Sequence, residues 1–271
     1  MSVIIDSTTR VLVQGITGKE SRFWTRHMID YGTNVVAGVT PGKEGQEVEG
    51  VPVFHTVRRA VAEFPADASL LFVPPRFAKD AVYEALDAGI ETVVVLSEGI
   101  PLHDALRMRR AALSTGAMVI GGNTSGVISA GEAMMGFFPY WIERVYRPGR
   151  VGVMTRSGSL TNEVTAHIVR AGLGTSSLVG VGGDAVPLTR FAEVLPMFEA
   201  DPETDAIVII GELGGTMEEE VAGAIVTAGK GTVEDKAVAL EGAGALVADR
   251  PGEVGKLLRS VLARESVARE G

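Results

Sequence analysis

Short apolar runs alternate with longer amphipathic stretches along most of the chain. In the first half the apolar runs lie at residues 10–13, 35–39, 69–73, 92–96 and 118–121, and stretches with helical periodicity lie at 21–31, 57–64, 77–88 and 102–115. The runs do not alternate with polar residues, which is typical of strands in a parallel sheet that helices cover on both faces. The first half therefore predicts an α/β domain.

The alternation stops at residues 129–147, which contain two glycines and several aromatic residues and lead into the turn sequence RPGR at 147–150. It then restarts, with apolar runs at 151–154, 177–181, 206–210 and 246–248 and helical stretches at 159–171, 190–199 and 252–268. We predict two α/β domains, residues 1–126 and 150–271, joined by a linker at 127–149.

Composition and charge exclude several classes of function. The 271 residues are 46% hydrophobic and 22% charged, and no run approaches the roughly 20 apolar residues that a membrane helix needs. The start, MSVIID, lacks the features of a signal peptide, so we expect a cytoplasmic protein without a membrane partner. A net charge of -9 argues against nucleic acid. The absence of cysteine excludes disulfides, thiolate metal sites and a cysteine nucleophile, and we expect no metal site in this chain.

Glycine-rich loops follow the predicted strands, where ligands of open α/β sheets bind. The first, QGITGKES at 14–21, has Gly15 and Gly18 before a helix, a place where backbone amides can approach a phosphate, although the spacing is not the full dinucleotide fingerprint. After the second run, Lys43 stands where an NAD site would have an acidic residue, which favours a nucleotide with an extra ribose phosphate, such as NADP or coenzyme A. Taken singly, a plain turn and a solvated lysine explain these residues as well.

The second half repeats the pattern. TRSGSLTNE, at 155–163, places Ser157, Gly158 and Ser159 at a helix start, which predicts an anion site. Thr155 replaces the first glycine of a G-x-S-x-G nucleophile elbow. Further glycine loops, GVGGD at 180–184 and GELGG at 211–215, would lie along the same sheet edge, and together they favour a ligand-binding crevice.

Together these motifs resemble a known family. VLVQGITGKE, YGTNVVAGVTPGKEG, LSEGIP, RPGRVGVMTRSGSLTNE, GVGGD and MFEADPETDAIVIIGELGG occur in one collinear order that covers nearly the whole chain. The sequence resembles the α subunit of succinyl-CoA synthetase (succinate–CoA ligase), an enzyme of the tricarboxylic acid cycle. The resemblance implies a Rossmann-like CoA-binding domain followed by a flavodoxin-like ligase domain, the second shortened here by about one strand.

The resemblance also implies roles for individual residues. Coenzyme A would be bound by Thr17, Gly18, Lys19 and Glu20, by Lys43 near its phosphates, and by Leu96, Ser97 and Glu98 on the adenine side. The helix start at Ser157, Gly158 and Ser159 would stabilise a phosphorylated histidine, and Glu212 would orient that histidine. A carboxylate beside an imidazole fixes the tautomer and raises its basicity.

In this family a partner β subunit with an ATP-grasp fold binds ATP or GTP with Mg²⁺ and phosphorylates the histidine. The phosphoryl group passes to a small carboxylic acid, and the CoA thiol attacks the resulting acyl phosphate. We therefore expect a subunit of an acid–thiol ligase that works in a hetero-oligomer.

The sequence departs from the family at three places. Thr124 and Ser125 replace a cysteine and a proline beside the CoA site, and Asn162 replaces a tyrosine associated with the acid substrate, so malate or another small dicarboxylate is a candidate. The family's histidine precedes AGAIV, where this chain has Val221, and a strand and a basic loop before it are missing. His27, His55, His103 and His167 lie in other surroundings, so we expect CoA binding without phosphohistidine formation.

Two other functions stay open at this point. One is a CoA-binding protein without ligase activity, and the other is an NADP-binding Rossmann protein. The acidic residue of an NAD site is absent, which argues against NAD itself.

Overall fold

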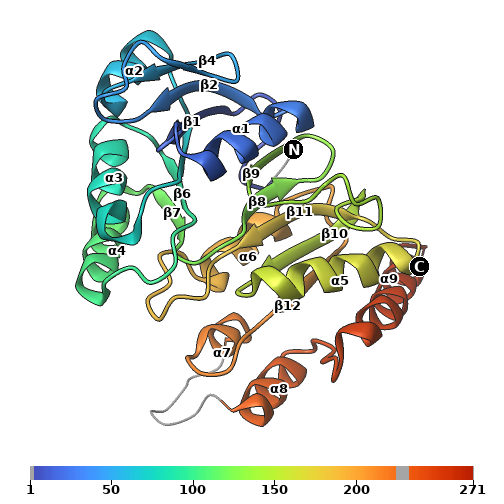
Figure 1. The fold of residues 1–271 in the computed structure, drawn as a ribbon. Coiled ribbons are helices and arrows are strands. Elements are labelled where there is room, and N and C mark those ends of the chain that lie inside the picture. The colour runs from blue at the N-terminus through green and yellow to red at the C-terminus, as the bar shows by residue number, and fades with distance from the viewer. Residues whose placement is uncertain (1–2, 224–231, 271) are drawn as a thin grey trace. The chain divides into compact units, whose positions relative to one another are not determined.

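The computed structural model describes residues 3–223 and 232–270, with side chains up to residue 263. The chain divides into two compact units (Figure 1). The N-terminal unit consists of Ile4–Phe138 and also Gly180–Thr189, and the C-terminal unit consists of Pro139–Val179 and Arg190–Gly271 together with Met1–Val3. The segment Gly180–Thr189 thus belongs to the N-terminal unit although it follows the first strands of the other.

A seven-stranded sheet forms the centre of the N-terminal unit. Its strands are β1 (Arg10–Gln14), β2 (Asn34–Val39), β3 (Glu47–Val48), β4 (Val51–Phe54), β5 (Ala68–Leu71), β6 (Thr92–Val95) and β7 (Met118–Gly121), in the order β3-β4-β2-β1-β5-β6-β7. All the paired strands are parallel except β3, which runs antiparallel to β4. Without β3 this is the Rossmann order, which reverses direction between β1 and β5 and leaves a ligand crevice there.

Four helices connect these strands: α1 (Lys19–Tyr31), α2 (Val57–Glu63), α3 (Pro75–Asp87) and α4 (Leu102–Thr115). Apolar side chains of the strands, such as Leu12, Leu71 and Val93, pack on Val82 of α3 and Met108 of α4 in a buried core. A hairpin of β8 (Gly126–Ser129) and β9 (Ala133–Gly136) follows. Thr33, after α1, fixes this hairpin, because its hydroxyl donates to the Met134 carbonyl at 2.8 Å and accepts from the Met134 amide at 2.9 Å.

The C-terminal unit is a second α/β structure. The strands β10 (Pro148–Thr155), β11 (Thr175–Gly180) and β12 (Ala206–Ile210) have the order β12-β10-β11, and β10 is parallel to β12. Its helices are α5 (Gly158–Arg170), α6 (Phe191–Glu199), α7 (Met217–Val221), α8 (Val233–Gly242) and α9 (Val254–Glu270), with a 3₁₀ turn, η1, at Pro251–Glu253.

The structure confirms the predicted α/β class and most element positions to within a few residues. The strand expected at 246–248 is wrong, since these residues have no regular structure. Leu246 is 41% exposed and follows Gly244, whose φ of +90° is a turn conformation, so this run has no sheet to join. The predicted linker at 127–149 is not irregular throughout, because it overlaps the hairpin of β8 and β9, which begins at Gly126. Within the described ranges, no helix combines the length and the apolar character that a membrane span requires.

Gly15 shows how closely the backbone passes at the β1–β5 crevice. Its φ is +77°, and a Cβ atom there would lie 2.2 Å from the carbonyl oxygen of Phe72, which follows β5. We predict that Gly15→Ala lowers the free energy of unfolding by about 3 kcal/mol or more, because backbone strain and overpacking add. Gly89→Ala is the matched control, since Gly89 has φ +84° but open space around it, and should cost only about 1 kcal/mol. Urea unfolding of both variants checks this, and equal losses would contradict the close approach.

Candidate functional site

The loop after β1 is fixed to the end of β2. The Gly15 amide donates to the Val39 carbonyl at 2.7 Å, and the hydroxyls of Thr17 and Thr40 are 3.2 Å apart. Gly18 caps α1 without a side-chain hydrogen bond, and Gly18, Lys19 and Glu20 are exposed. The first amides of α1 therefore face the carboxyl edge of the sheet without a side-chain cap, as an anion-binding helix start requires.

Lys43 lies in a short turn beyond the end of β2. Its amide donates to the Thr40 carbonyl at 3.1 Å, and the Gly42 amide donates to Nδ1 of His55 at 2.8 Å. The lysine side chain is exposed. The turn thus presents a cation at the strand adjacent to β1, and His55 has a structural role as an acceptor.

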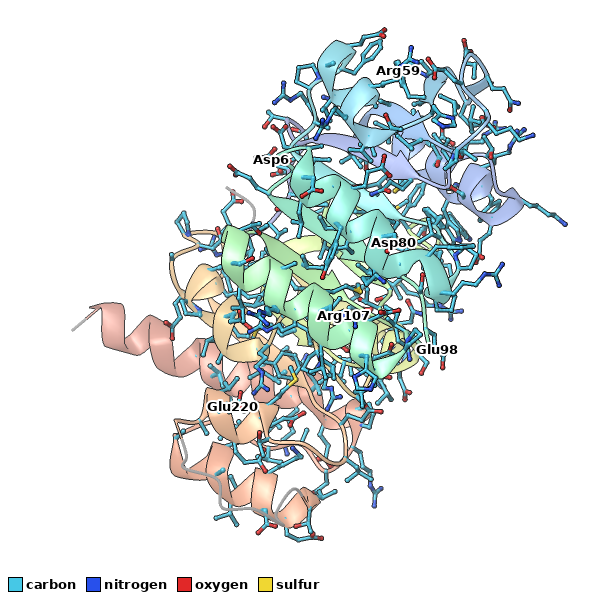
Figure 2. All side chains as sticks on the ribbon, turned by 90° about the vertical axis from the view of Figure 1, so that its left-hand side faces the viewer. Asp6, Arg59, Asp80, Glu98, Arg107 and Glu220 are labelled. Carbon is cyan, nitrogen blue, oxygen red and sulfur yellow. The ribbon has the colours of Figure 1, made fainter. Side chains whose placement is uncertain are left out.

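The predicted adenine-side residues follow β6. Leu96 is buried, the Ser97 hydroxyl donates to the Val73 carbonyl at 2.5 Å, and the Asn123 amide donates to the Ser97 carbonyl at 2.8 Å. Glu98 is exposed and lies near the start of α4 (Figure 2). Because β1, β2 and β6 are parallel strands of one sheet, all the predicted CoA residues lie at the same edge.

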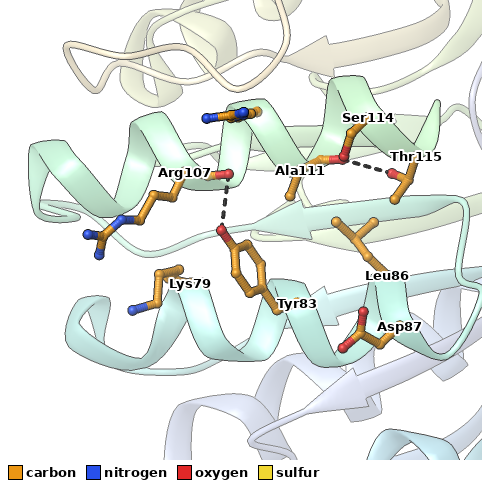
Figure 3. A pocket seen from close by; sticks show the side chains of 9 residues that line it. Lys79, Tyr83, Leu86, Asp87, Arg107, Ala111, Ser114 and Thr115 are labelled. Carbon is orange, nitrogen blue, oxygen red and sulfur yellow. Dashed lines mark hydrogen bonds between the residues drawn. The ribbon is translucent and has the colours of Figure 1, made fainter.

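A surface groove lies elsewhere on this unit, between α3 and α4 (Figure 3). The Tyr83 hydroxyl donates there to the Arg107 carbonyl at 3.3 Å. Lys79 Nζ and the Arg107 guanidinium each lie 3.5 Å from the same carboxylate oxygen of Asp104. The groove is formed by the sides of α3 and α4, and two of its cations, Lys79 and Arg107, share the Asp104 carboxylate. It is distinct from the strand-end site.

In the C-terminal unit, the turn after β10 is built by hydroxyl contacts. The Ser157 hydroxyl accepts from the Leu160 amide at 3.4 Å, and the Ser157 amide donates to the Thr155 hydroxyl at 3.0 Å. Thr161 donates to the Ser157 carbonyl at 2.6 Å. Gly158 and Ser159 are exposed. Hydrogen bonds therefore fix the start of α5, which is exposed, and the anion site expected there stays a prediction.

Glu212 follows β12, the strand beside β10, so the structure brings it next to this turn. The Arg156 amide donates to the Ile210 carbonyl at 3.0 Å, and the Arg156 guanidinium lies 3.5 Å from Oε2 of Glu212. The Arg156 side chain is 9% exposed, whereas that of Glu212 is 49% exposed. Arg156 is a candidate site residue that our sequence analysis missed, and the signal was a cation directly before SGS at a strand end.

A buried ionic cluster of Glu218, Glu219 and Lys236 stabilises the loop that carries Glu212. Glu218 Oε1 accepts from the Glu212 amide at 3.0 Å, and Glu218 Oε2 lies 2.5 Å from Lys236 Nζ. The same ammonium group donates to Glu219 at 3.0 Å and to the Gly215 carbonyl at 3.1 Å. All three charged side chains are buried. From the sequence, Glu218 and Glu219 indicated only an acidic helix start. Their burial depends on Lys236, which follows Glu219 by 17 residues, and this pairing cannot be seen in the local sequence.

The position expected for the histidine is described, and Val221 occupies it as the last residue of α7. The four histidines lie elsewhere, His27 on α1, His55 after β4, His103 on α4 and His167 on α5. His167 is 4.0 Å from Glu163 and, ten residues along α5, about 15 Å from Ser157. None of the four histidines therefore lies in the segment that follows Glu212, where the family's histidine is expected.

Asn162 lies one helical turn after Gly158 on α5, and its side-chain oxygen accepts a hydrogen bond from the Tyr146 hydroxyl. Tyr146 is buried, and burial raises the pKa of its phenol, which therefore stays protonated as a donor. This hydrogen bond uses the side-chain oxygen of Asn162 and not its amide nitrogen, which is the donor group of the side chain.

Comparison with known proteins supports both halves of the chain as members of known domain families. Residues 6–99 match the CoA binding domain family and residues 154–260 match the CoA-ligase family. The chain is 60% identical to the ADP-forming sulfoacetate-CoA ligase subunit SauD of Bilophila wadsworthia, across 97% of this chain and 100% of that protein. It is 45% identical to the succinate–CoA ligase [ADP-forming] subunit alpha 2 of Archaeoglobus fulgidus, again across 97% and 100%.

A solved structure of the ATP citrate lyase of Methanothrix soehngenii, in complex with citrate and coenzyme A, has a TM-score of 0.87 at 24% identity. It matches 98% of this chain, which spans about half, 51%, of that longer protein. At this identity the likeness concerns the fold alone.

The two units, with their strand-end loops, define a two-domain CoA-binding subunit of a ligase. The chain belongs to the α-subunit family of the ADP-forming CoA ligases, which includes the succinate–CoA ligases. The predicted family, fold and ligase class are confirmed, and the NADP alternative is not favoured.

The buried cluster predicts a stability test. Lys236→Met leaves Glu218 and Glu219 buried without a counter-ion, so we expect the free energy of unfolding to fall by about 3–5 kcal/mol. Lys256→Met, which removes an exposed lysine from α9, should change it by less than about 0.5 kcal/mol. Denaturant unfolding measures both, and a loss for Lys236→Met no larger than the control would show that the cluster does not stabilise the loop.

Proposed function

We propose that this chain is the CoA-binding subunit of an ADP-forming ligase that joins coenzyme A to a small acid with a second anionic group. The observation that carries the proposal is the pair of strand-end sites, one on each unit. The first has uncapped amides at α1 and the cation Lys43, which suit a nucleotide bearing phosphates. The second has the α5 start and Glu212, which suit a phosphoryl group and its carrier.

We assign the CoA contacts to the residues at the first edge. Thr17, Gly18, Lys19 and Glu20 would lie along CoA, and the exposed ammonium of Lys43 would meet its ribose phosphate. Leu96, Ser97 and Glu98 would hold the adenine side. Support comes from their common location beyond the carboxyl ends of three parallel strands and from the CoA binding domain match over residues 6–99.

The acid substrate is proposed from the nearer relatives. The chain is 60% identical to a subunit of a sulfoacetate-CoA ligase but 42–45% identical to several succinate–CoA ligase subunits. Asn162 would place an amide donor at the acid's second anionic group, and such a donor suits a sulfonate as well as a carboxylate, so the identities decide the choice. We therefore favour sulfoacetate over succinate or malate, and a role outside the tricarboxylic acid cycle.

The partner would be a separate ATP-grasp subunit that holds ATP and Mg²⁺. The relatives' names describe ADP-forming enzymes and subunits, which favours ATP over GTP. The helix start at Ser157, Gly158 and Ser159 would face the partner's nucleotide, because the phosphoryl group must pass there. In the family reaction, the acid displaces the phosphoryl carrier to give an acyl phosphate, and the CoA thiol then displaces phosphate from that carbonyl.

We further propose that this chain lacks the phosphoryl carrier itself. Val221 has no atom that accepts a phosphoryl group, and covalent catalysis needs a nucleophile within reach of its orienting group. The alignment with the Bilophila subunit runs over 292 positions, more than the 271 residues of this chain, which supports an internal segment present only in the relative. The chain would therefore bind CoA as a ligase subunit does, and the ligase reaction would need the segment that it lacks.

Substitution of Lys43 tests the CoA site. If its ammonium meets the ribose phosphate, Lys43→Ala should weaken CoA about tenfold, as expected for one lost charge-assisted contact, and leave dephospho-CoA nearly unchanged. Calorimetric titration measures both. Arg110→Ala, which removes an exposed cation from α4, is the control and should change neither affinity. Equal losses of CoA and dephospho-CoA in Lys43→Ala would refute this role.

The absence of a phosphoryl carrier is tested by labelling. The chain and an ATP-grasp partner are incubated with γ-labelled ATP, and we expect no acid-labile, base-stable label on this chain. The SauD subunit with its own partner serves as the positive control. Label that disappears on replacing His27, His55, His103 or His167 would identify a substitute nucleophile and contradict the proposal.

A further inference from the structure

The segment Gly180–Thr189 passes from the C-terminal half of the sequence into the CoA-binding unit. Several hydrogen bonds fix it there. The Thr124 hydroxyl donates to the Gly180 carbonyl at 2.5 Å, the Gly183 amide donates to the Asn123 carbonyl at 2.9 Å, and the Leu188 amide donates to the Gly121 carbonyl at 3.0 Å. The segment thus lies along the loop after β7. One of the hydrogen bonds that hold the segment comes from Thr124, which stands where the family has a cysteine.

The far end of the segment is buried. Leu188 belongs to the core of the unit, the Arg109 guanidinium donates to its carbonyl at 2.6 Å, and the Thr189 hydroxyl donates to the Val119 carbonyl at 2.7 Å. Anchored at both ends, the residues between Gly183 and Leu188 have a defined position relative to the strand ends.

Asp184 lies within this anchored stretch and faces the loop after β6. Its Oδ1 accepts from the Gly99 amide at 3.4 Å and its Oδ2 accepts from the Ile100 amide at 3.3 Å. Both bonds are long, but one carboxylate satisfies two consecutive amides just before α4 begins at Leu102. A carboxylate is also favoured there by the positive end of the helix dipole.

The loop after β7 also packs closely against the loop after β6 and against Asp184, at Gly122. A Cβ atom on Gly122 would lie 2.7 Å from Ile100 Cδ1, 2.8 Å from the Ser97 carbonyl and 3.0 Å from Asp184 Oδ2. The loop after β6, the loop after β7 and the Asp184 carboxylate therefore meet around one glycine. A shift of any of them displaces the residues from Ser97 to Ile100.

We propose that Asp184 is a positioning residue of the CoA site, which fixes the Leu96–Glu98 loop for the adenine end of coenzyme A. This inference rests on the proposed function, because the adenine side is assigned there. Asp184 acts through the amides of Gly99 and Ile100 and does not touch the ligand. The aspartate of GVGGD thereby contributes to the CoA-binding unit although its sequence position lies beyond the first strand of the ligase half.

The affinities for two fragments of CoA distinguish a role of Asp184 at the adenine end from a general loss of CoA binding. We expect Asp184→Ala to weaken CoA and adenosine 3′,5′-bisphosphate by the same factor of about ten, and to leave phosphopantetheine binding unchanged. Asp184→Asn keeps one acceptor oxygen and should lose less affinity than Asp184→Ala, about threefold. Asp87→Ala, an exposed acid on α3, is the matched control and should change none of the affinities.

Amide hydrogen exchange supplies a second measurement, in which Gly99 and Ile100 should exchange faster in Asp184→Ala while the strands keep their protection. Wild-type protein that does not bind CoA would refute the proposed function. Wild-type protein that binds CoA, with unchanged binding in Asp184→Ala or equal weakening of both fragments, would overturn this inference alone. If Asp184→Ala does not fold, wild-type affinity for the bisphosphate in Asp184→Asn would overturn it.

Discussion

The parallel arrangement of strands is the constraint on which both sites depend. Parallel neighbours place their carboxyl ends at one edge, so loops far apart in sequence meet there. In the N-terminal unit this edge gathers the loops after β1, β2 and β6, and in the C-terminal unit it sets Glu212 beside the start of α5. The glycines in these loops allow the close approach, as Gly15 does against the Phe72 carbonyl.

The two edges differ in how they are stabilised. The first is held by hydrogen bonds among threonine, serine and backbone groups, such as the Ser97 hydroxyl on the Val73 carbonyl, and by one carboxylate, that of Asp184, which accepts from amides of the loop after β6. The second depends on charge, because Arg156 faces Glu212 and a buried lysine between two glutamates holds the same loop. Buried ion pairs fix geometry at a cost in desolvation, which suits a loop whose carboxylate must point in one direction.

The sequence predicted most strands from its apolar runs, and the loop motifs identified the family. Local pattern did not reveal what depends on distant partners. Lys236 pairs with the buried Glu218 and Glu219, and Asp184 belongs to the N-terminal unit, and neither contact has a short-range signature. Arg156 has a local signal, its place directly before SGS, but that signal does not reveal its pairing with Glu212. The strand expected at 246–248 was wrong because an apolar run forms a strand only where a neighbouring strand offers hydrogen bonds.

The central claim is that the CoA site is intact while the phosphoryl carrier is missing at Val221. The most direct measurement is acyl-CoA formation by this chain with an ATP-grasp partner, before and after the additional segment of the Bilophila subunit, which we expect to carry the histidine, is grafted after Val221. We predict CoA binding by both forms and turnover by the grafted form alone. Turnover by the chain as it stands, or a grafted chain that binds CoA and partner but stays inactive, would contradict the account.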